Sequence, residues 1–352
     1  MIKFYLLVFL ATAVLSFTLT LFFRFVAFKI GAVDYPDERK IHKKPVARLG
    51  GLAIFIAFFI VVFSISSLDK HLVGLFIGTL ILLFFGLLDD IFNLNPFVKL
   101  FGQILAALAI IASGIGIDYI TNPFGGIIYL NTLKIPIDLF GVTYHITVWS
   151  DLFTIFWTVV LINAVNFLDG LDGLAAGVSG ISALVIFLLS LSSGVFQPQT
   201  AILALVLAGT AFGFLPLNFY PAKIFMGDTG SMFLGFMLAV LAIFSGGKVA
   251  TALLILGLPI LDVLWAFIRR VLAGKSPFRP DKKHLHHAFL KKGLSQRQTV
   301  LIIYVITLVF GTLALISKTF YKFVALVTLA LLVVVLISFL YFLDTKKENP
   351  NI

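Results

Sequence analysis

The sequence contains no cysteine, and only 12% of its 352 residues are charged. Without cysteine, disulfides, iron–sulfur clusters and thiolate zinc sites are excluded. The scarcity of charge comes with 61% hydrophobic residues and a mean hydropathy of +1.12. A soluble globular protein could not bury that much apolar surface, so the sequence predicts an integral membrane protein.

Long apolar runs recur along the chain, and each has about the 20 residues that a helix needs to cross a hydrocarbon core of roughly 30 Å. They do not alternate as the strands of a β-barrel would. We therefore predict an all-α, polytopic transmembrane helical bundle of about 11 spans, forming one domain over residues 1–352, with the first run retained as a span. The expected spans lie near residues 4–28, 50–67, 72–88, 99–117, 148–165, 174–192, 199–217, 230–245, 250–268, 299–316 and 322–343.

The positive charges indicate the orientation of the bundle. Placing the loop 29–49 in the cytoplasm collects most of the 26 Lys and Arg residues on that side. The positive-inside rule then predicts an external N-terminus and a cytoplasmic C-terminus. The net charge of +10 is explained by this topology and by anionic lipids, without a nucleic-acid partner. On the external side, the alternating stretch Ile127 to Ile137 predicts a small β-hairpin.

Five of the 16 acidic residues stand at the ends of apolar runs. A charge at a bilayer boundary must be hydrated, paired or bound to a metal, so five such acids indicate function. The predicted topology brings all five to the cytoplasmic side, although it was derived without them. They are Asp89, Asp90, Asp169, Asp172 and Asp228.

Asp89 and Asp90 are adjacent carboxylates at the end of the third expected span, and Lys99 follows at the start of the fourth. Neighbouring acids repel unless a cation lies beside them. Mg²⁺ suits such a pair because it takes few protein ligands and completes its shell with water and phosphate. A solvated helix end explains the pair equally well when it is taken alone.

The segment from Asn163 to Leu174 is the most specific in the chain. Asn163, Asn166, Asp169 and Asp172 recur every three residues, which places their oxygens near one face of a helix end or turn. An EF-hand calcium loop is excluded, because an apolar span follows where its Glu would have to lie. The pattern favours a site for a metal, a phosphate or another polar ligand.

The eighth expected span opens with Asp228 among small and hydroxyl residues. Free N–H groups at a helix start suit a phosphate, and an adjacent Asp suits a metal that would bridge to it. Thr229 and Ser231 are best interpreted as helix caps. Phe225 could stack on a nucleobase, although packing is the favoured role in a chain with 39 Phe residues.

Two basic loops complete the candidate site. The first contains Arg48, and the loop 269–298 contains Arg279, His284, His286 and His287. His-x-His-His could bind zinc, but no fourth ligand is evident, so contact with a pyrophosphate is favoured, with a merely solvated loop as the alternative. The active-site loops are expected near residues 29–49, 89–99, 166–173, 218–231 and 269–298.

Four segments together resemble the polyprenyl-phosphate N-acetylhexosamine-1-phosphate transferases, and the resemblance spans nearly the whole chain. It implies a multi-pass helical protein of the bacterial cytoplasmic membrane whose active site faces the cytoplasm. The segment Pro45 to Gly51 and the His-x-His-His pattern are similar to the WecA/TagO branch, whereas MraY proteins usually carry three consecutive histidines. The four segments are Leu88–Asp90, Asn163–Leu174, Phe225–Ser231 and His284–His287.

The resemblance implies transfer of N-acetylglucosamine-1-phosphate from UDP-N-acetylglucosamine to undecaprenyl phosphate, giving the polyprenyl-diphosphate sugar and UMP. This would be the first membrane step in the synthesis of a cell-envelope polysaccharide or teichoic acid. The implied cofactor is Mg²⁺, with Mn²⁺ as the alternative, and a homodimer is compatible with the family. The alternative donor is that of the MraY-type phospho-N-acetylmuramoyl-pentapeptide transferases.

The resemblance also implies a role for each matching residue. Asp228, Asp90 and Asp89 would hold the metal and, with His284, form the catalytic group; whether Asp89 acts as a base or positions the substrate stays open. The substrate-binding residues would be Lys99, Asn163, Asn166, Asp169, Asp172, Phe225, Arg279, His286, His287 and Arg48.

An ion-coupled transporter is the rival from another class, because intramembrane carboxylates and broken helices are also typical of transporters. Two features weigh against it. The acids gather at one membrane face and not at the midplane, and the sequence shows no convincing pair of inverted repeats.

Overall fold

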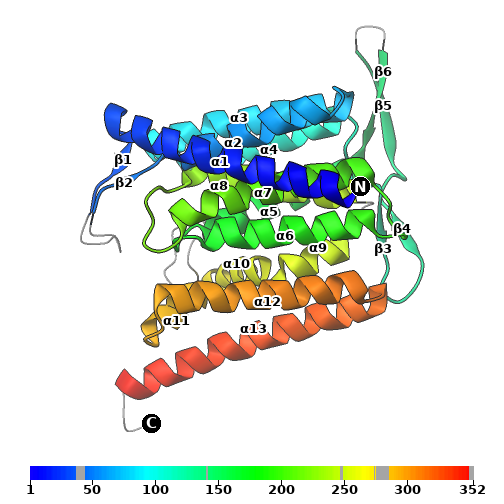
Figure 1. The fold of residues 1–352 in the computed structure, drawn as a ribbon. Coiled ribbons are helices and arrows are strands. Elements are labelled where there is room, and N and C mark those ends of the chain that lie inside the picture. Colours follow the sequence, from blue (N-terminus) through cyan, green and yellow to red (C-terminus); the bar gives the residue numbers. More distant parts are fainter. Residues whose placement is uncertain (37–43, 140–141, 246–248, 273, 275–284, 349–352) are drawn as a thin grey trace.

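The computed structural model describes residues 1–36, 44–139, 142–245, 249–272, 274 and 285–348, and it shows a bundle of helices that run roughly along one direction (Figure 1). The strands β1 and β2 and the short helix α11 lie at one end of the bundle, and β3 to β6 lie at the other. The helices are α1 (Ile2–Ile30), α2 (Gly50–Ile65), α3 (Lys70–Phe92), α4 (Pro96–Ala112), α5 (Val148–Leu168), α6 (Leu174–Leu191), α7 (Pro198–Asn218), α8 (Gly227–Phe244), α9 (Val249–Ile255), α10 (Gly257–Leu272), α11 (Leu285–Lys291), α12 (Gln296–Ile316) and α13 (Thr319–Glu348).

Within the described residues, seven helices are long and apolar enough to cross a membrane: α1, α3, α5, α6, α7, α8 and α12. The bent pair α9–α10 is an eighth candidate, and shorter apolar helices are formed by α2, α4 and Thr319–Val335. A polytopic helical membrane protein is therefore confirmed. The count of 11 spans and the orientation stay predictions.

The ninth expected span, 250–268, is not one continuous helix. It is divided into α9 and α10, whose axes differ by 79°. The break lies just before Gly257 and Pro259. Proline removes a backbone donor and glycine weakens a helix interior, which explains why an apolar run of sufficient length bends at this point.

Helix α8 forms the centre of the bundle. Every residue from Thr229 to Ile243 is buried, and α8 packs against α2, α3, α5, α6 and α7. In contrast, α1 buries mainly a stripe at four-residue spacing, comprising Val8, Thr12, Ser16 and Thr20, which faces α7. Many of its other large apolar side chains, among them Leu6, Leu10 and Phe22, are exposed, as expected of a surface that contacts lipid.

The strands form three antiparallel pairs: β1 (Val33–Asp34) with β2 (Val46–Ala47), β3 (Tyr119–Thr121) with β4 (Ile127–Tyr129), and β5 (Lys134–Leu139) with β6 (Val142–Thr147). The pairing predicted within Ile127 to Ile137 is therefore wrong, because this stretch contributes one strand to each of two hairpins. Gly125 and Gly126 have positive φ angles of 119° and 82° and form the turn that folds Ile127 back onto Thr121.

The start of α2 is clamped onto the start of α8. Gly50 N donates to Phe225 O and Gly51 N donates to Met226 O, both at 3.0 Å. A side chain on Gly51 would place its first carbon 2.4 Å from Gly230 N. The backbones of α2 and α8 can approach this closely only because Gly50 and Gly51 lack a side chain.

Replacing Gly51 with Ala should therefore destabilise the protein by about 1–3 kcal/mol, because the added carbon forces the two helices apart. The thermal unfolding temperature in detergent measures the effect. Gly194→Ala is the matched control, since nothing lies within 4 Å of a carbon added there. An equal unfolding temperature for both variants would contradict the close approach.

Candidate active site

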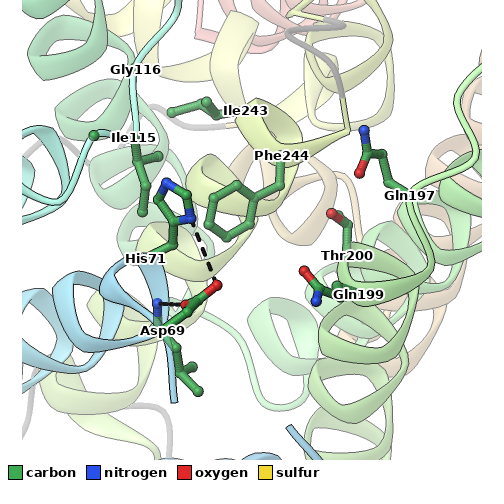
Figure 2. Close-up of a pocket in the computed structure, with 11 residues that line it drawn as sticks. Asp69, His71, Ile115, Gly116, Gln197, Gln199, Thr200, Ile243 and Phe244 are labelled. Atoms are coloured by element: carbon green, nitrogen blue, oxygen red, sulfur yellow. Dashed lines mark hydrogen bonds and ion pairs between the residues drawn. The ribbon is translucent and has the colours of Figure 1, made fainter. Parts of the chain in front are cut away.

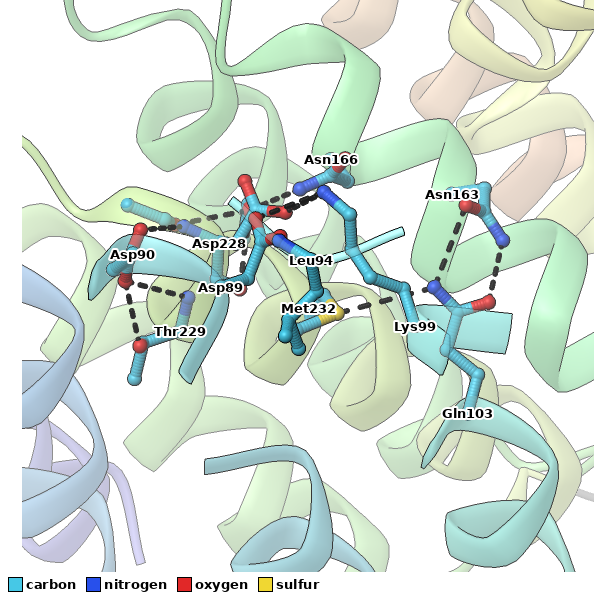
Figure 3. A network of polar contacts seen from close by, with 12 residues as sticks. Asp89, Asp90, Leu94, Lys99, Gln103, Asn163, Asn166, Asp228, Thr229 and Met232 are labelled. Atoms are coloured by element: carbon cyan, nitrogen blue, oxygen red, sulfur yellow. Dashed lines mark hydrogen bonds and ion pairs between the residues drawn. The ribbon is translucent and has the colours of Figure 1, made fainter. Parts of the chain in front are cut away.

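A lysine bridges two carboxylates from different helices at the end of the bundle that carries β1 and β2 (Figure 3). Lys99 Nζ lies 2.8 Å from Asp89 Oδ2 at the end of α3 and 2.7 Å from Asp228 Oδ2 at the start of α8. Asp89 is 7% exposed, so its charge depends on this partner. The predicted convergence of Asp89, Lys99 and Asp228 is present.

The short connection between α3 and α4 brings Lys99 back over Asp89. Asn93 adopts a left-handed conformation with φ 50°, and Asp89 Oδ1 accepts a hydrogen bond from Leu94 N at 2.7 Å. Asn95 then caps α4, whose first residue is Pro96. These turn and cap residues place Lys99 in the first turn of α4.

Asp90 caps the N-terminus of α8. Its Oδ1 accepts from Asp228 N at 3.0 Å, and its Oδ2 accepts from Thr229 N at 3.3 Å and Thr229 Oγ1 at 2.8 Å. Gly227 has φ 67°, and a side chain there would collide with both Asp90 oxygens. The cap fixes the backbone of Asp228, and the helix dipole favours the negative charge of Asp90.

These bonds bear on the metal role expected for Asp90. A carboxylate oxygen has two lone pairs, and Oδ2 already accepts two hydrogen bonds, whereas Oδ1 accepts one. The observed role of Asp90 is to position Asp228. Metal binding by Asp90 stays a prediction.

Arg48 lies beside the same helix end. Its Nη1 is 3.4 Å from the backbone oxygen of Asp90 and 3.7 Å from Asp34 Oδ1. Ala47, the residue before Arg48, fixes this segment against the chain that leads into α8, because its backbone oxygen accepts a hydrogen bond from Phe225 N at 2.8 Å. Arg48 and the half-buried Phe225 are thus at the site, and their contact with a substrate stays a prediction.

The two asparagines of α5 take different positions. Asn166 donates to Ser231 Oγ at 2.9 Å and so borders Asp228. Asn163 lies one turn deeper, where its amide donates to Gln103 Oε1 at 2.7 Å and to Val159 O at 2.8 Å. Their three-residue spacing places the two amides at successive depths of the site, where they contact different partners (Figure 3).

The acids that follow α5 lie in the turn before α6. Asp172 Oδ2 accepts from Ala222 N at 2.9 Å, which ties this turn to the segment leading to α8. The pKa of Asp169 is raised well above its usual value, first by burial and then by repulsion from Asp228, Asp90 and Asp172. Four carboxylates are thus close enough to act on one another.

Asp89, Asp90 and Asp228 place three carboxylates around the start of α8, and this excess of acidic groups favours a bound cation. Lys99 is the ammonium shared by Asp89 and Asp228, but it cannot balance the whole group. Among the residues that the structure describes, no three acids or histidines are arranged to hold a metal by themselves. Mg²⁺ is typically bound by one or two carboxylates together with water and substrate phosphates, so the site fits Mg²⁺ on these terms.

The basic loop after α10 is only partly covered by the structure. Arg279 and His284 lie outside the described residues. His286 and His287 belong to α11, which lies at the same end of the bundle as β1 and β2 (Figure 1), and their side chains are not described. The roles expected for these four residues stay predictions.

Two amide residues of the site were missed by sequence analysis. Gln103 is 3% exposed and pairs with Asn163. Asn218 is 1% exposed; its Oδ1 accepts from Gly173 N at 3.1 Å and its Nδ2 donates to Ile224 O at 3.0 Å. Both interrupt apolar runs, and this polarity inside a span is the signal that could have revealed them.

Replacing Gln103 with Leu should destabilise the protein by about 1 kcal/mol, because it removes one of the two acceptors of the half-buried Asn163 amide and leaves Val159 O as the other. The unfolding temperature in detergent is the measurement. Combining Gln103→Leu with Asn163→Leu should recover much of the lost stability, since neither amide is then left alone. Additive losses in the double variant would contradict the pairing.

Comparison with known proteins identifies the family. Residues 72–246, which run from α3 to the end of α8, match the model of glycosyl transferase family 4. A Bacillus subtilis protein, the probable undecaprenyl-phosphate N-acetylglucosaminyl 1-phosphate transferase, is 36% identical over 84% of this chain and 79% of its own length. The chain belongs to glycosyl transferase family 4.

Two further relatives of this family cover most of the chain. The decaprenyl-phosphate N-acetylglucosaminephosphotransferase of Mycobacterium tuberculosis is 36% identical over 85% of this chain and 78% of its own length. The undecaprenyl-phosphate alpha-N-acetylglucosaminyl 1-phosphate transferase of Thermotoga maritima is 32% identical over 90% of this chain and 92% of its own. The expected membership among the polyprenyl-phosphate N-acetylhexosamine-1-phosphate transferases is confirmed, which disfavours the transporter hypothesis.

Proposed function

We propose that the protein transfers N-acetylglucosamine-1-phosphate from UDP-N-acetylglucosamine to undecaprenyl phosphate, giving undecaprenyl-diphosphate-N-acetylglucosamine and UMP. The names of the relatives support this reaction. The main structural support is the pair of ion contacts that Lys99 makes with Asp89 and Asp228, because they identify the residues that would act on the phosphates. It lies within the part of the chain that matches the family.

The reaction is a displacement at phosphorus. An oxygen of the lipid phosphate bonds to the β-phosphorus of the donor, the bond from this phosphorus to the bridging oxygen breaks, and UMP leaves with that oxygen. A phosphate monoester is already largely ionised at pH 7, since its second pKa is about 6. We therefore assign Asp89 to positioning Lys99 and not to removing a proton.

The main task of the site is to bring two anionic phosphates together, which requires positive charge. We propose that Asp228 and Asp89 hold Mg²⁺, or Mn²⁺ in its place, together with the substrate phosphates. When bound, the ion would neutralise phosphate charge during the displacement. Asp90 keeps Asp228 in position, and Lys99 offers its ammonium to phosphate oxygens.

The remaining substrate contacts are proposed from the family resemblance. Phe225 would stack on the uracil, and Asn166, Asp169 and Asp172 would line the uridine diphosphate site. The donor diphosphate and sugar would meet basic and imidazole groups of the two basic loops. These are Arg48, Arg279, His284, His286 and His287.

We further propose 11 spans in the bacterial cytoplasmic membrane, with the active site facing the cytoplasm. The seven candidate spans, the bent pair and the three shorter apolar helices together supply that number. Lys29, Arg48, Lys223 and Arg297 belong to the end of the bundle that holds the carboxylates. This distribution supports a cytoplasmic site by the positive-inside rule.

The experiment is an assay of purified protein with undecaprenyl phosphate and each of three donors: UDP-N-acetylglucosamine, UDP-N-acetylgalactosamine and UDP-N-acetylmuramoyl-pentapeptide. Each mixture is run with Mg²⁺, with Mn²⁺ and with EDTA, and lipid-linked product and UMP are quantified. We expect product from UDP-N-acetylglucosamine and none in EDTA. Product from the pentapeptide donor alone would replace this proposal with an MraY-type reaction.

A further inference from the structure

A polar cavity lies at the end of the bundle opposite the carboxylate site. It has a volume of about 380 Å³ and is lined by the starts of α3 and α7, the turn after α4 and the end of α8 (Figure 2). Helix α3 runs from this cavity, at Asp69, to the active site, at Asp89. At 1.5 Å per residue, about 30 Å separates the two sites, so the proposed reaction does not account for this cavity.

One wall of the cavity is the N-terminus of α7. The cap residue Gln197 makes no side-chain hydrogen bond to the helix. Thr200, in the first turn, is 4% exposed, and its hydroxyl has no hydrogen-bond partner among the described residues. Figure 2 shows this hydroxyl directed into the cavity. A helix start without a cap presents N–H donors and a partial positive charge, and both favour an anion.

On the facing side, His71 lines the cavity, and Lys70 stands beside the lining next to Gly114. A carbon added to Gly114, which lines the cavity, would lie 3.4 Å from Lys70 Nζ and 3.8 Å from His71 Nε2. The acid of this wall already has partners, since Asp69 Oδ1 accepts from Leu72 N at 2.8 Å and Asp69 Oδ2 lies 3.8 Å from His71 Nδ1. Lys70 Nζ, which makes no ion pair within the described part of the chain, is therefore the charge beside this wall that remains for a ligand.

The remaining lining is apolar and comprises Ile115, Ile243 and Phe244. The Phe244 ring stands beside His71, with ring centroids 6.2 Å apart. A bare ion would gain nothing from these side chains. A phosphate that carries an organic group could contact them while its oxygens face α7.

We propose that this cavity binds the phosphate group of a phosphate ester. The N–H groups of the first turn of α7 and the Thr200 hydroxyl donate to the phosphate oxygens, and Lys70 supplies positive charge from beside the opposite wall. Two sources share this chemistry. They are the headgroup of a phospholipid in the adjacent leaflet and a soluble phosphate ester on that side.

The test compares ligands that differ only by the phosphate. Purified protein in neutral detergent is mixed with dioleoyl phosphatidic acid or with dioleoylglycerol, and bound lipid is counted by native mass spectrometry. In a second arm, glycerol 3-phosphate and glycerol are titrated calorimetrically. Thr200→Val removes the hydroxyl at nearly constant shape, Thr200→Ser keeps it, and Lys70→Met removes the charge.

We expect the phosphate-bearing ligand to bind and its phosphate-free analogue not to bind, with affinity about tenfold weaker in Thr200→Val and in Lys70→Met, because each loses a hydrogen bond to a charged group. Thr200→Ser should bind normally. Lys318→Gln should also bind normally, because Lys318 lies at the same end of the bundle but does not line the cavity. Binding of the lipid alone identifies a headgroup site, and binding of glycerol 3-phosphate identifies a soluble ligand.

Equal binding with and without the phosphate would overturn the proposal, as would affinities that Thr200→Val and Lys70→Met leave unchanged. If Thr200→Val does not fold, Lys70→Met still decides the question. The test is independent of the proposed transfer reaction, because it measures binding and not turnover.

Discussion

Replacing Asp228 with Asn should lower the rate of sugar-phosphate transfer by about 100- to 1,000-fold, the usual cost of removing one electrostatic contact to a transition state. Asn keeps the shape and the position in the first turn of α8 but loses the charge that faces Lys99 at 2.7 Å. It should also raise the Mg²⁺ concentration needed for half-maximal rate. Initial rates measured over a Mg²⁺ series give both quantities.

Asp118→Asn is the matched control, because Asp118 contacts Ser150 at the other end of the bundle. It should leave both the rate and the Mg²⁺ requirement unchanged. If Asp228→Asn retained a near-normal rate at low Mg²⁺ concentration, Asp228 could not hold the ion. A parallel loss in the control would instead indicate a general effect of removing an acid.

Replacing Lys99 with Met should lower kcat/KM by about 100-fold, because the ammonium that stabilises phosphate charge is lost. The change also leaves Asp89 and Asp228 to repel each other across the bridge. Lys99→Arg should restore part of the activity, since it returns the charge with a planar group of different shape. Steady-state kinetics with varied donor concentration measure the effect.

The control for Lys99 is Lys134→Met, in β5 at the opposite end of the bundle. It removes the same charge from the same side-chain type and should leave kcat/KM unchanged. If Lys99→Met and Lys99→Arg were equally inactive, shape and not charge would be the property that matters at this position. Full activity of Lys99→Met would remove the residue from the mechanism.

The helices and the convergence of the acids could be predicted from the sequence because both follow from burial of charge. Runs of about 20 apolar residues have few alternatives to a membrane helix. Asp89, Asp90 and Asp228 interrupt such runs and needed partners. Their convergence with Lys99 follows from this requirement.

The details of the site could not be predicted, because they depend on which helices touch. The pairing of Gln103 with Asn163 requires α4 and α5 to pack at one register, and the cap that Asp90 provides for α8 requires a close approach at Gly227. Spacing along one helix carries no information about a neighbour. For the same reason, the three-residue repeat suggested one polar wall, whereas the structure directs Asn163 and Asn166 to different partners.

The strands at the end of the bundle opposite the carboxylates were mispredicted for a local reason. Alternation of apolar and polar residues identified Ile127 to Ile137 as extended, but a strand's partner is chosen by the turns on either side. The positive φ angles at Gly125 and Gly126 turn the chain before this stretch. Taking Gly125 and Gly126 as a turn would have paired Ile127–Tyr129 with Tyr119–Thr121, as observed.

Transfer of the donor's phosphate together with its sugar is the central claim, and UDP-N-acetylglucosamine labelled with ³²P at the β-phosphate tests it most directly. The purified protein is incubated with this donor, undecaprenyl phosphate and Mg²⁺, and the products are separated. We expect the label to move into the lipid fraction with the sugar and the UMP formed to be unlabelled. Label retained in released UDP, or no labelled lipid at all, would contradict it.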